Sequence, residues 1–209
     1  IRTEGDRILD QPLTAIGGKG VFTKEIEDAL LDGRIDLAVH SLKDLPTEFP
    51  PGLSLASVPR REDPRDIFIA KDSATKLADL PPGGRVGTGS LRRRAQLRAF
   101  RPDLEMVDIR GNLDTRLRKL DSGEMDGIVL AAAGFSRLGW KDRITELLST
   151  GVCLPAVGQG ALGLECRTED RDTLSRVSGL DHPETNRAVR AERALLRRQV
   201  VAGAEGAAL

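Results

Sequence analysis

The pattern of apolar and polar positions alternates along the chain between strand-like and helix-like segments. Short apolar runs bounded by turn residues predict strands at residues 35–40, 53–58, 85–88, 105–109 and 127–133. Apolar residues at helical spacing predict helices at residues 24–31, 91–100, 113–120 and 185–198. Such alternation is typical of an α/β fold with a mostly parallel sheet.

The segment 85–133 predicts the order β-α-β-α-β, which is that of a doubly wound unit. Its last run, 127–133, is almost wholly apolar, as is typical of a central parallel strand buried on both faces. Ligands of such units bind beyond the carboxyl ends of the strands. We therefore expect a binding site on the loops that follow these three strands.

Two segments interrupt the pattern and predict crossings of the chain between two domains. Residues 60–66 form a dense charged run, and residues 157–164 are rich in glycine and could carry the chain back to the first domain. Two connections of this kind form a hinge, so we expect the two domains to shift relative to each other.

Composition excludes several classes of protein. The chain has no apolar run long enough to span a membrane, and its first residues lack the apolar core of a signal peptide. With only two cysteines, a disulfide framework is not expected, and a reducing cytoplasm is the default location. Only 3% of residues are aromatic and none is tyrosine, which disfavours a nucleic-acid platform. No cysteine or histidine cluster has the spacing of a metal site.

Arginine outnumbers lysine among the 32 basic residues, although 32 acidic residues balance the net charge to zero. Arg92 and Arg93 fall in the first turn of the predicted helix 91–100, which Ser90 can cap. The helix dipole disfavours cations there, and rules broken without visible compensation tend to mark functional sites. We interpret this turn as an anion-binding site; the alternative is two solvated surface arginines.

The same arrangement recurs after the next strand. Arg110 closes the strand, and Asn112 can cap the helix that carries Arg116. Arg137 follows the apolar strand 127–133. Arginine suits bidentate binding of carboxylates, so five arginines on successive loops suit a ligand with several carboxylates.

The run HSLKDLP, which follows the predicted strand 35–40, holds the other candidate residues. His40 at a strand end is more often a hydrogen-bonded structural residue than a catalyst. Asp44 beside Lys43 is either an ordinary turn pair or an acid–base group that also stabilises cations. Lys19, in a glycine-rich turn that is too short for a P-loop, could present its charge to the same anion.

Seven runs resemble the hydroxymethylbilane synthase (porphobilinogen deaminase) family in their order and spacing. They are GGKGVFTKEIEDALLDGRIDLAVHSLKDLPTEFPPGL, REDPRD, VGTGSLRRRAQL, IRGNLDTRLRKL, LAAAGFSRLGW, LPAVGQGALGLECR and AERALL. The resemblance implies two doubly wound domains like those of type II periplasmic binding proteins, plus a third α+β domain. It places domain 1 at residues 1–62 and 160–180, domain 2 at 63–159 and a remnant of domain 3 at 181–209.

The same resemblance implies a transferase that joins four porphobilinogen molecules head to tail into hydroxymethylbilane and releases ammonia. Its active site would lie between domains 1 and 2 and hold a dipyrromethane cofactor, attached by a thioether to a cysteine of domain 3. It further implies a cytoplasmic monomer, or a plastid protein in a plant, that takes porphobilinogen as substrate and binds neither nucleic acid nor membrane.

The resemblance also assigns roles to single residues. Asp44 would hydrogen-bond pyrrole N–H groups, assist proton transfer and stabilise cationic intermediates. Carboxylate side chains would be held by Lys19, Lys43, Arg92, Arg93, Arg110, Arg116 and Arg137. Cofactor contacts would come from Thr88, Ser90 and Arg193. Residues of the cleft and the hinge would be Phe22, Gln159 and Gly160.

The chain departs from the family pattern at both ends. The segment that normally precedes the RTEGD run is not in the sequence, nor is the Leu-Glu-Gly-Gly-Cys segment that holds the cofactor cysteine. Neither Cys153 nor Cys166 lies in that context, so we assign the cofactor attachment to neither. The alternative reading is a non-catalytic two-domain protein that binds a polycarboxylate; we expect Asp44→Ala to discriminate the two.

Overall fold

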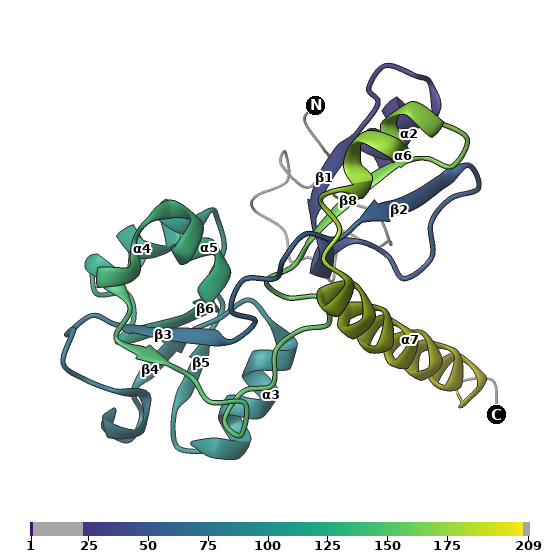
Figure 1. Ribbon diagram of the computed structural model, residues 1–209. Coiled ribbons are helices and arrows are strands. Elements are labelled where there is room, and N and C mark those ends of the chain that lie inside the picture. Colours follow the sequence, from purple (N-terminus) through teal and green to yellow (C-terminus); the bar gives the residue numbers. More distant parts are fainter. Residues whose placement is uncertain (2–22, 207–209) are drawn as a thin grey trace. The chain divides into compact units, whose positions relative to one another are not determined.

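The computed structural model describes residue 1 and residues 23–206 (Figure 1). The chain divides into two compact units, residues 1–61 with 161–209 (unit 1) and residues 62–160 (unit 2). Between residues 23 and 206, no helix is both long and apolar enough to cross a membrane. The assignment of residues 181–209 to a third domain stays a prediction.

Unit 2 is built on a five-stranded mixed sheet. Its strands are β3 (Asp66–Ala70), β4 (Arg85–Gly87), β5 (Glu105–Val107), β6 (Gly127–Ala131) and β7 (Glu146–Leu147), in the order β5-β4-β6-β3-β7. Strands β4, β5 and β6 are parallel, whereas β3 runs antiparallel to β6 and β7. The carboxyl ends of β5, β4 and β6 therefore meet at one edge, where the predicted arginine loops begin.

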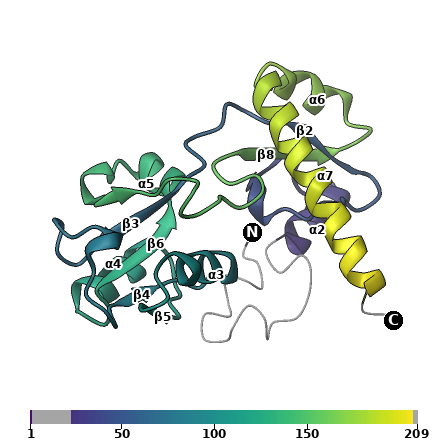
Figure 2. The same cartoon turned by 90° about the horizontal axis from the view of Figure 1, so that it is seen from below.

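Helices cover both faces of this sheet, as Figures 1 and 2 show for α3 (Leu91–Phe100), α4 (Leu113–Asp121) and α5 (Ala132–Leu138). Side chains alternate across β3, so Phe68 belongs to the core beside Leu97 of α3, and Ile67 to the core with Leu120 of α4. The prediction of a doubly wound unit is confirmed here. Short 3₁₀ turns at Leu77–Asp79 and Lys141–Arg143 complete the connections.

The described part of unit 1 contains a three-stranded antiparallel sheet. Strand β8 (Leu162–Arg167) lies between β1 (Ala38–Ser41) and β2 (Leu53–Ser57). The helices are α2 (Lys24–Leu31), α6 (Arg171–Ser178) and α7 (Pro183–Gly206), and a 3₁₀ turn, η1 (Leu42–Asp44), follows β1. Val189 of α7 packs with Leu42 and Leu45, so the last helix shares the core beneath this turn.

The α/β class is confirmed, but the expectation of a mostly parallel sheet holds only for β4, β5 and β6. The segments 66–70 and 162–167 were not expected as strands, and both are antiparallel to their neighbours. Each begins within a predicted crossing, where charged or glycine-rich residues obscure the short strand pattern. Helices α5 and α6 were also missed. The first two residues of α5, Ala132 and Ala133, were assigned to the apolar strand 127–133, which ends at Ala131.

Gly160 joins the two crossing segments closely. Its backbone φ is +85°, which residues that carry a side chain rarely adopt. A Cβ atom at this position would lie 2.7 Å from the Glu62 carbonyl oxygen. The Glu62 N–H donates to the Gly160 carbonyl at 3.1 Å. Only glycine therefore fits where the two segments hydrogen-bond to each other.

Candidate functional site

The predicted arginines of unit 2 follow the ends of three adjacent parallel strands. The Ser90 hydroxyl accepts from the Arg93 N–H at 3.4 Å, and the Asn112 side chain accepts from the Thr115 N–H at 2.9 Å. Both predicted caps are confirmed, and they begin α3 and α4 at the edge that the sequence predicts. Thr88 is buried, and its hydroxyl accepts from the Ser90 N–H at 3.2 Å.

Arg92 and Arg93 meet one buried carboxylate, that of Asp66 at the start of β3. Arg93 donates from Nε at 3.1 Å and from Nη2 at 2.8 Å, both to Oδ1. Arg92 Nη1 lies 2.9 Å from Oδ2. Burial alone would raise the pKa of Asp66, but Arg93 and then Arg92 outweigh it, so the pKa is below its usual value.

Two further side chains complete the surroundings of Asp66. Gln159 Nε2 donates to Asp66 Oδ1 at 2.8 Å and to the Pro64 carbonyl at 2.6 Å. The Cys153 thiol donates to Asp66 Oδ2 at 3.2 Å. Burial and the neighbouring charge of Asp66 raise the pKa of Cys153 to about 11. Cys153 is thus a protonated, buried donor rather than a nucleophile.

Positive charge exceeds negative charge around Arg116. Burial lowers the pKa of its guanidinium, and the charges of Arg93 and Arg110 lower it further. Asp108 opposes this, but it lies 3.5 Å from Arg110 Nε. Arg116 Nε donates to the Gly111 carbonyl at 2.7 Å, and among the described residues Arg116 has no ion pair. A ligand carboxylate fits this excess of positive charge.

Arg137 takes a different position from the other four arginines. Its side chain is exposed, and Nη2 donates to the Gly160 carbonyl at 3.0 Å. It therefore contacts the crossing segment that Gln159 and Gly160 form.

In unit 1, Asp44 ends the η1 turn that follows β1. Its side chain is exposed, yet the atoms packed around it displace enough water to raise the pKa of the carboxyl. The charges of Lys43 and His40 oppose this rise without cancelling it. Within residues 23–199, no arginine or lysine makes an ion pair with Asp44. A carboxyl with a raised pKa can bind and release a proton closer to neutral pH.

His40 lies in β1, just before the turn, and is hydrogen-bonded through one ring nitrogen. Its Nε2 is 2.8 Å from Glu165 Oε2, and both side chains are buried. The structural interpretation of His40 as a hydrogen-bonded residue is confirmed. Glu165 was missed, because its strand β8 was not predicted.

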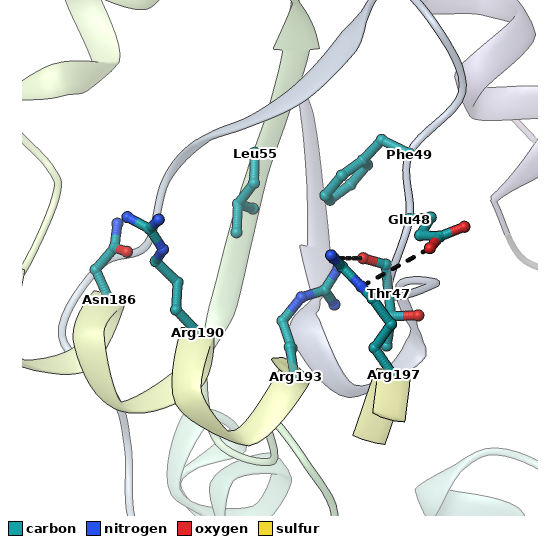
Figure 3. Close-up of a pocket in the computed structure, with 8 residues that line it drawn as sticks. All are labelled: Thr47, Glu48, Phe49, Leu55, Asn186, Arg190, Arg193 and Arg197. Carbon is teal, nitrogen blue, oxygen red and sulfur yellow. Dashed lines mark hydrogen bonds and ion pairs between the residues drawn. The ribbon is translucent and has the colours of Figure 1, made fainter. Parts of the chain in front are cut away.

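Arg193 of α7 hydrogen-bonds to the backbone just after Asp44. Its Nη1 and Nη2 donate to the Leu45 and Pro46 carbonyls at 3.4 and 2.5 Å, and its guanidinium lies 5.4 Å from the Phe49 ring centre. Figure 3 shows Arg193 beside Arg190 and Arg197 in a cavity of about 460 Å³. Burial and then the charge of Arg197 lower the pKa of Arg193. In the structure this residue supports the turn that carries Asp44.

Some predicted residues can be placed only in part. Lys19 and Phe22 lie outside the described residues, and Lys43 is exposed beside Asp44. Asp66 was missed as a site residue because the charged run 60–66 was interpreted only as a crossing. The signal was an acid directly before an apolar strand, in a chain with arginines at an unfavourable helix start.

These features define an α/β protein with a guanidinium-rich anion site in one unit and a carboxyl group of raised pKa in the other. A family model described as "Porphobilinogen deaminase, dipyromethane cofactor binding domain" matches residues 1–175. The chain belongs to the porphobilinogen deaminase family. The family resemblance that the sequence runs indicate is therefore confirmed.

Curated relatives named porphobilinogen deaminase match almost the whole chain. The protein of Geobacter sp. (strain M21) is 59% identical over 94% of this chain and 61% of its own length. That of Pelobacter propionicus is 58% identical over 95% of this chain and 63% of its own length. The chain thus spans about three fifths of the length of these relatives.

Solved structures show a weaker likeness. An ancestral cationic amino acid solute binding protein has a TM-score of 0.45 at 16% identity, over 84% of this chain and 69% of its own. The periplasmic VFT2 domain of BvgS from Bordetella pertussis has a TM-score of 0.44 at 16% identity, over 79% and 71%. At these values the likeness says nothing about function.

Proposed function

We propose that this chain acts in porphobilinogen deamination: it joins four porphobilinogen molecules head to tail into hydroxymethylbilane and releases ammonia. The observation that carries the proposal is Asp44, whose carboxyl has a raised pKa and no direct cationic partner among the described residues. Loss of ammonia requires a proton donor, and the resulting cation requires a nearby negative charge. One carboxyl that can exist in both forms meets both needs.

The arginines of unit 2 supply the complementary half of the proposal. Porphobilinogen carries two carboxylates, and a chain of pyrroles carries more. Arg116 can bind a carboxylate because positive charge exceeds negative charge around it. Arg110, which follows β5, and Arg92, which follows β4, can each bind another. Further carboxylate binding is proposed for Arg93, Arg137, Lys43 and Lys19. Thr88 and Ser90 are proposed to contact the cofactor.

A dipyrromethane cofactor fits the same residues, because its carboxylates would meet the positive charge around Arg116. When bound, it would supply the free pyrrole carbon to which the first substrate is joined. Cys153 and Cys166 are both fully buried free thiols, and the pKa of each is raised. Neither suits a thioether, so we propose that attachment depends on neither.

Asp44→Ala tests the proposed function. We expect porphobilinogen consumption to fall by about 10² to 10⁴-fold, the range for loss of a general acid–base group. The matched control is Asp32→Asn, which removes an exposed carboxylate elsewhere in unit 1 and should leave the rate unchanged. Full activity in Asp44→Ala would show that the acid–base assignment is wrong.

The alternative function is binding of a polycarboxylate without chemistry, and the arginines alone could provide it. This alternative predicts that the chain binds porphobilinogen but releases no ammonia. Ammonia measured in the same reaction discriminates the two functions. Bound porphobilinogen with release of ammonia favours the enzyme, and bound porphobilinogen without release of ammonia favours the binding protein.

A further inference from the structure

Asp66 is the most heavily hydrogen-bonded carboxylate in the described part of unit 2. It opens β3, its side chain is completely buried, and four different side chains donate to it. Two of these are Arg92 and Arg93, the arginines proposed above to bind carboxylates.

We propose that Asp66 is a positioning residue, which holds the guanidinium groups of Arg92 and Arg93 side by side for a carboxylate ligand. The inference rests on the proposed function, because it takes these arginines to be ligand-binding groups. Asp66 itself is buried and would not touch the ligand.

The geometry divides the carboxylate between the two arginines. Oδ1 accepts from Arg93 Nε and Nη2, while Oδ2 lies 2.9 Å from Arg92 Nη1. Arg93 also donates from Nη1 to the Val129 carbonyl at 3.3 Å, which fixes its plane against β6. One carboxylate thereby sets the orientation of two neighbouring guanidinium groups.

Electrostatics explains why a carboxylate is needed. Two adjacent cations in the first turn of α3 repel each other and face the positive end of the helix dipole. Asp66 supplies the opposing charge, and the arginines in turn keep its pKa below the usual value. The negative charge that balances the two arginines is thus absent from residues 91–93 themselves. It comes from Asp66, which lies 27 positions away from Arg93.

The arginines remain unequal in their access to a ligand. The Arg93 side chain is 8% exposed and that of Arg92 is 25% exposed. Arg92 also donates to the Leu154 carbonyl, and its Nη2 lies 3.4 Å from Gln159 Oε1. Because a quarter of its side chain is exposed, Arg92 can meet a ligand while Asp66 holds Nη1.

Asp66→Asn removes the charge with little change in size. The asparagine amide can accept at only one oxygen, and its NH₂ group faces a guanidinium, so at least one arginine is released. The matched control is Asp63→Asn, because Asp63 forms an ion pair with Arg65 at 2.6 Å but touches neither Arg92 nor Arg93.

The direct measurement is the rate at which phenylglyoxal modifies single arginines of the full chain, followed by peptide mass spectrometry. In Asp66→Asn we expect Arg92 or Arg93 to react about tenfold faster or more, as loss of a charge-assisted hydrogen bond implies. Arg101, which pairs with Asp103 at 2.6 Å in the same unit, reports on general unfolding and should keep its rate. Asp63→Asn should change neither Arg92 nor Arg93.

Chemical rescue and kinetics sharpen the test. In Asp66→Ala, formate should slow the modification again because it can replace the missing carboxylate, whereas chloride at equal ionic strength should not. The apparent KM for porphobilinogen should rise more than kcat falls in Asp66→Asn, because binding geometry is lost rather than proton transfer.

The outcomes separate the positioning role from the proposed function. Unchanged rates at Arg92 and Arg93, or an equal rise at Arg101, would overturn the positioning role. A lower KM in Asp66→Asn would also overturn it, since Asp66 would then compete with the ligand. If the modification rates change as expected but the wild-type chain consumes no porphobilinogen, the positioning role stands and the proposed function fails.

Discussion

Asp44 in unit 1 and Asp66 in unit 2 are two aspartates in opposite electrostatic surroundings. Asp44 ends a turn after β1, and the loss of solvent around it raises the pKa of its carboxyl. Asp66 opens β3 in complete burial, and two arginines lower its pKa. The more deeply buried group is therefore the one that stays ionised, because direct partners outweigh desolvation.

The difference shows how environment can divide the roles of identical side chains. A carboxyl that lacks a direct cation can gain and lose a proton, which suits acid–base chemistry. A carboxylate held by two guanidinium groups is a fixed charge, which suits the positioning of other residues.

The largest effect on stability should come from Asp66→Ala. It leaves Arg93 buried without its counter-ion, and breaking one side of a buried ion pair costs about 3–5 kcal/mol. Urea denaturation measures the free energy of unfolding. The control Asp63→Ala removes a partly exposed pair and should cost about 1 kcal/mol or less. Equal losses in the free energy of unfolding of the two variants would mean that Asp66 contributes no more to stability than an exposed ion pair does.

A smaller loss of stability is expected from Arg193→Ala, which changes the support of the turn that carries Asp44. It removes the hydrogen bonds to the Leu45 and Pro46 carbonyls and should cost about 1–3 kcal/mol. Because these bonds hold the chain after Asp44, porphobilinogen consumption should fall as well. Arg190→Ala, from the same face of α7, is the control; an equal fall in its activity would argue against a specific support of the turn.

The pH dependence of stability should carry the signature of Asp66. Its lowered pKa means that its contribution is present above the ordinary aspartate pKa, about 3.9, and is lost as the pH falls below that value. The stability difference between wild type and Asp66→Asn should therefore shrink as the pH is lowered from about 4 toward the lowered pKa. A difference that stays constant across this range would contradict the lowered pKa.

The smallest effect on stability should come from Asp44→Asn, which we expect to stabilise the protein slightly at neutral pH. Because the pKa of Asp44 is raised, the folded state binds more protons than the unfolded state just above pH 4, and stability falls as the pH rises through this window. At neutral pH the ionised carboxyl is a cost that asparagine removes. We expect a slightly higher melting temperature in Asp44→Asn, together with loss of activity, and a lower melting temperature would contradict this.

Much of unit 2 could be predicted from the sequence because its patterns are local. Residues 91–100 form a helix with the predicted bounds, and Ser90 and Asn112 cap the helices as expected. The partners of the arginines could not be predicted in this way. Arg93 and Asp66 are 27 positions apart, and their contact depends on β3 entering the sheet beside β6.

In unit 1 the sequence located the Asp44 turn but not what supports it. His40 was expected to be hydrogen-bonded, yet its partner Glu165 lies 125 positions later, on a strand that glycine-rich residues conceal. Arg193 was interpreted through the family likeness as a cofactor contact, whereas its observed hydrogen bonds run to the chain after Asp44. Contacts over such separations follow from the folded topology and leave no local pattern.

A carbon-detected NMR titration of the aspartate carboxyl groups compares Asp44 and Asp66 in one experiment, with Asp44→Asn and Asp66→Asn spectra to assign the two signals. We expect the Asp44 carboxyl to titrate above the ordinary aspartate pKa and Asp66 to stay ionised below it. Two signals that titrate together in the ordinary range would contradict the division of roles between a proton-transferring and a fixed carboxylate.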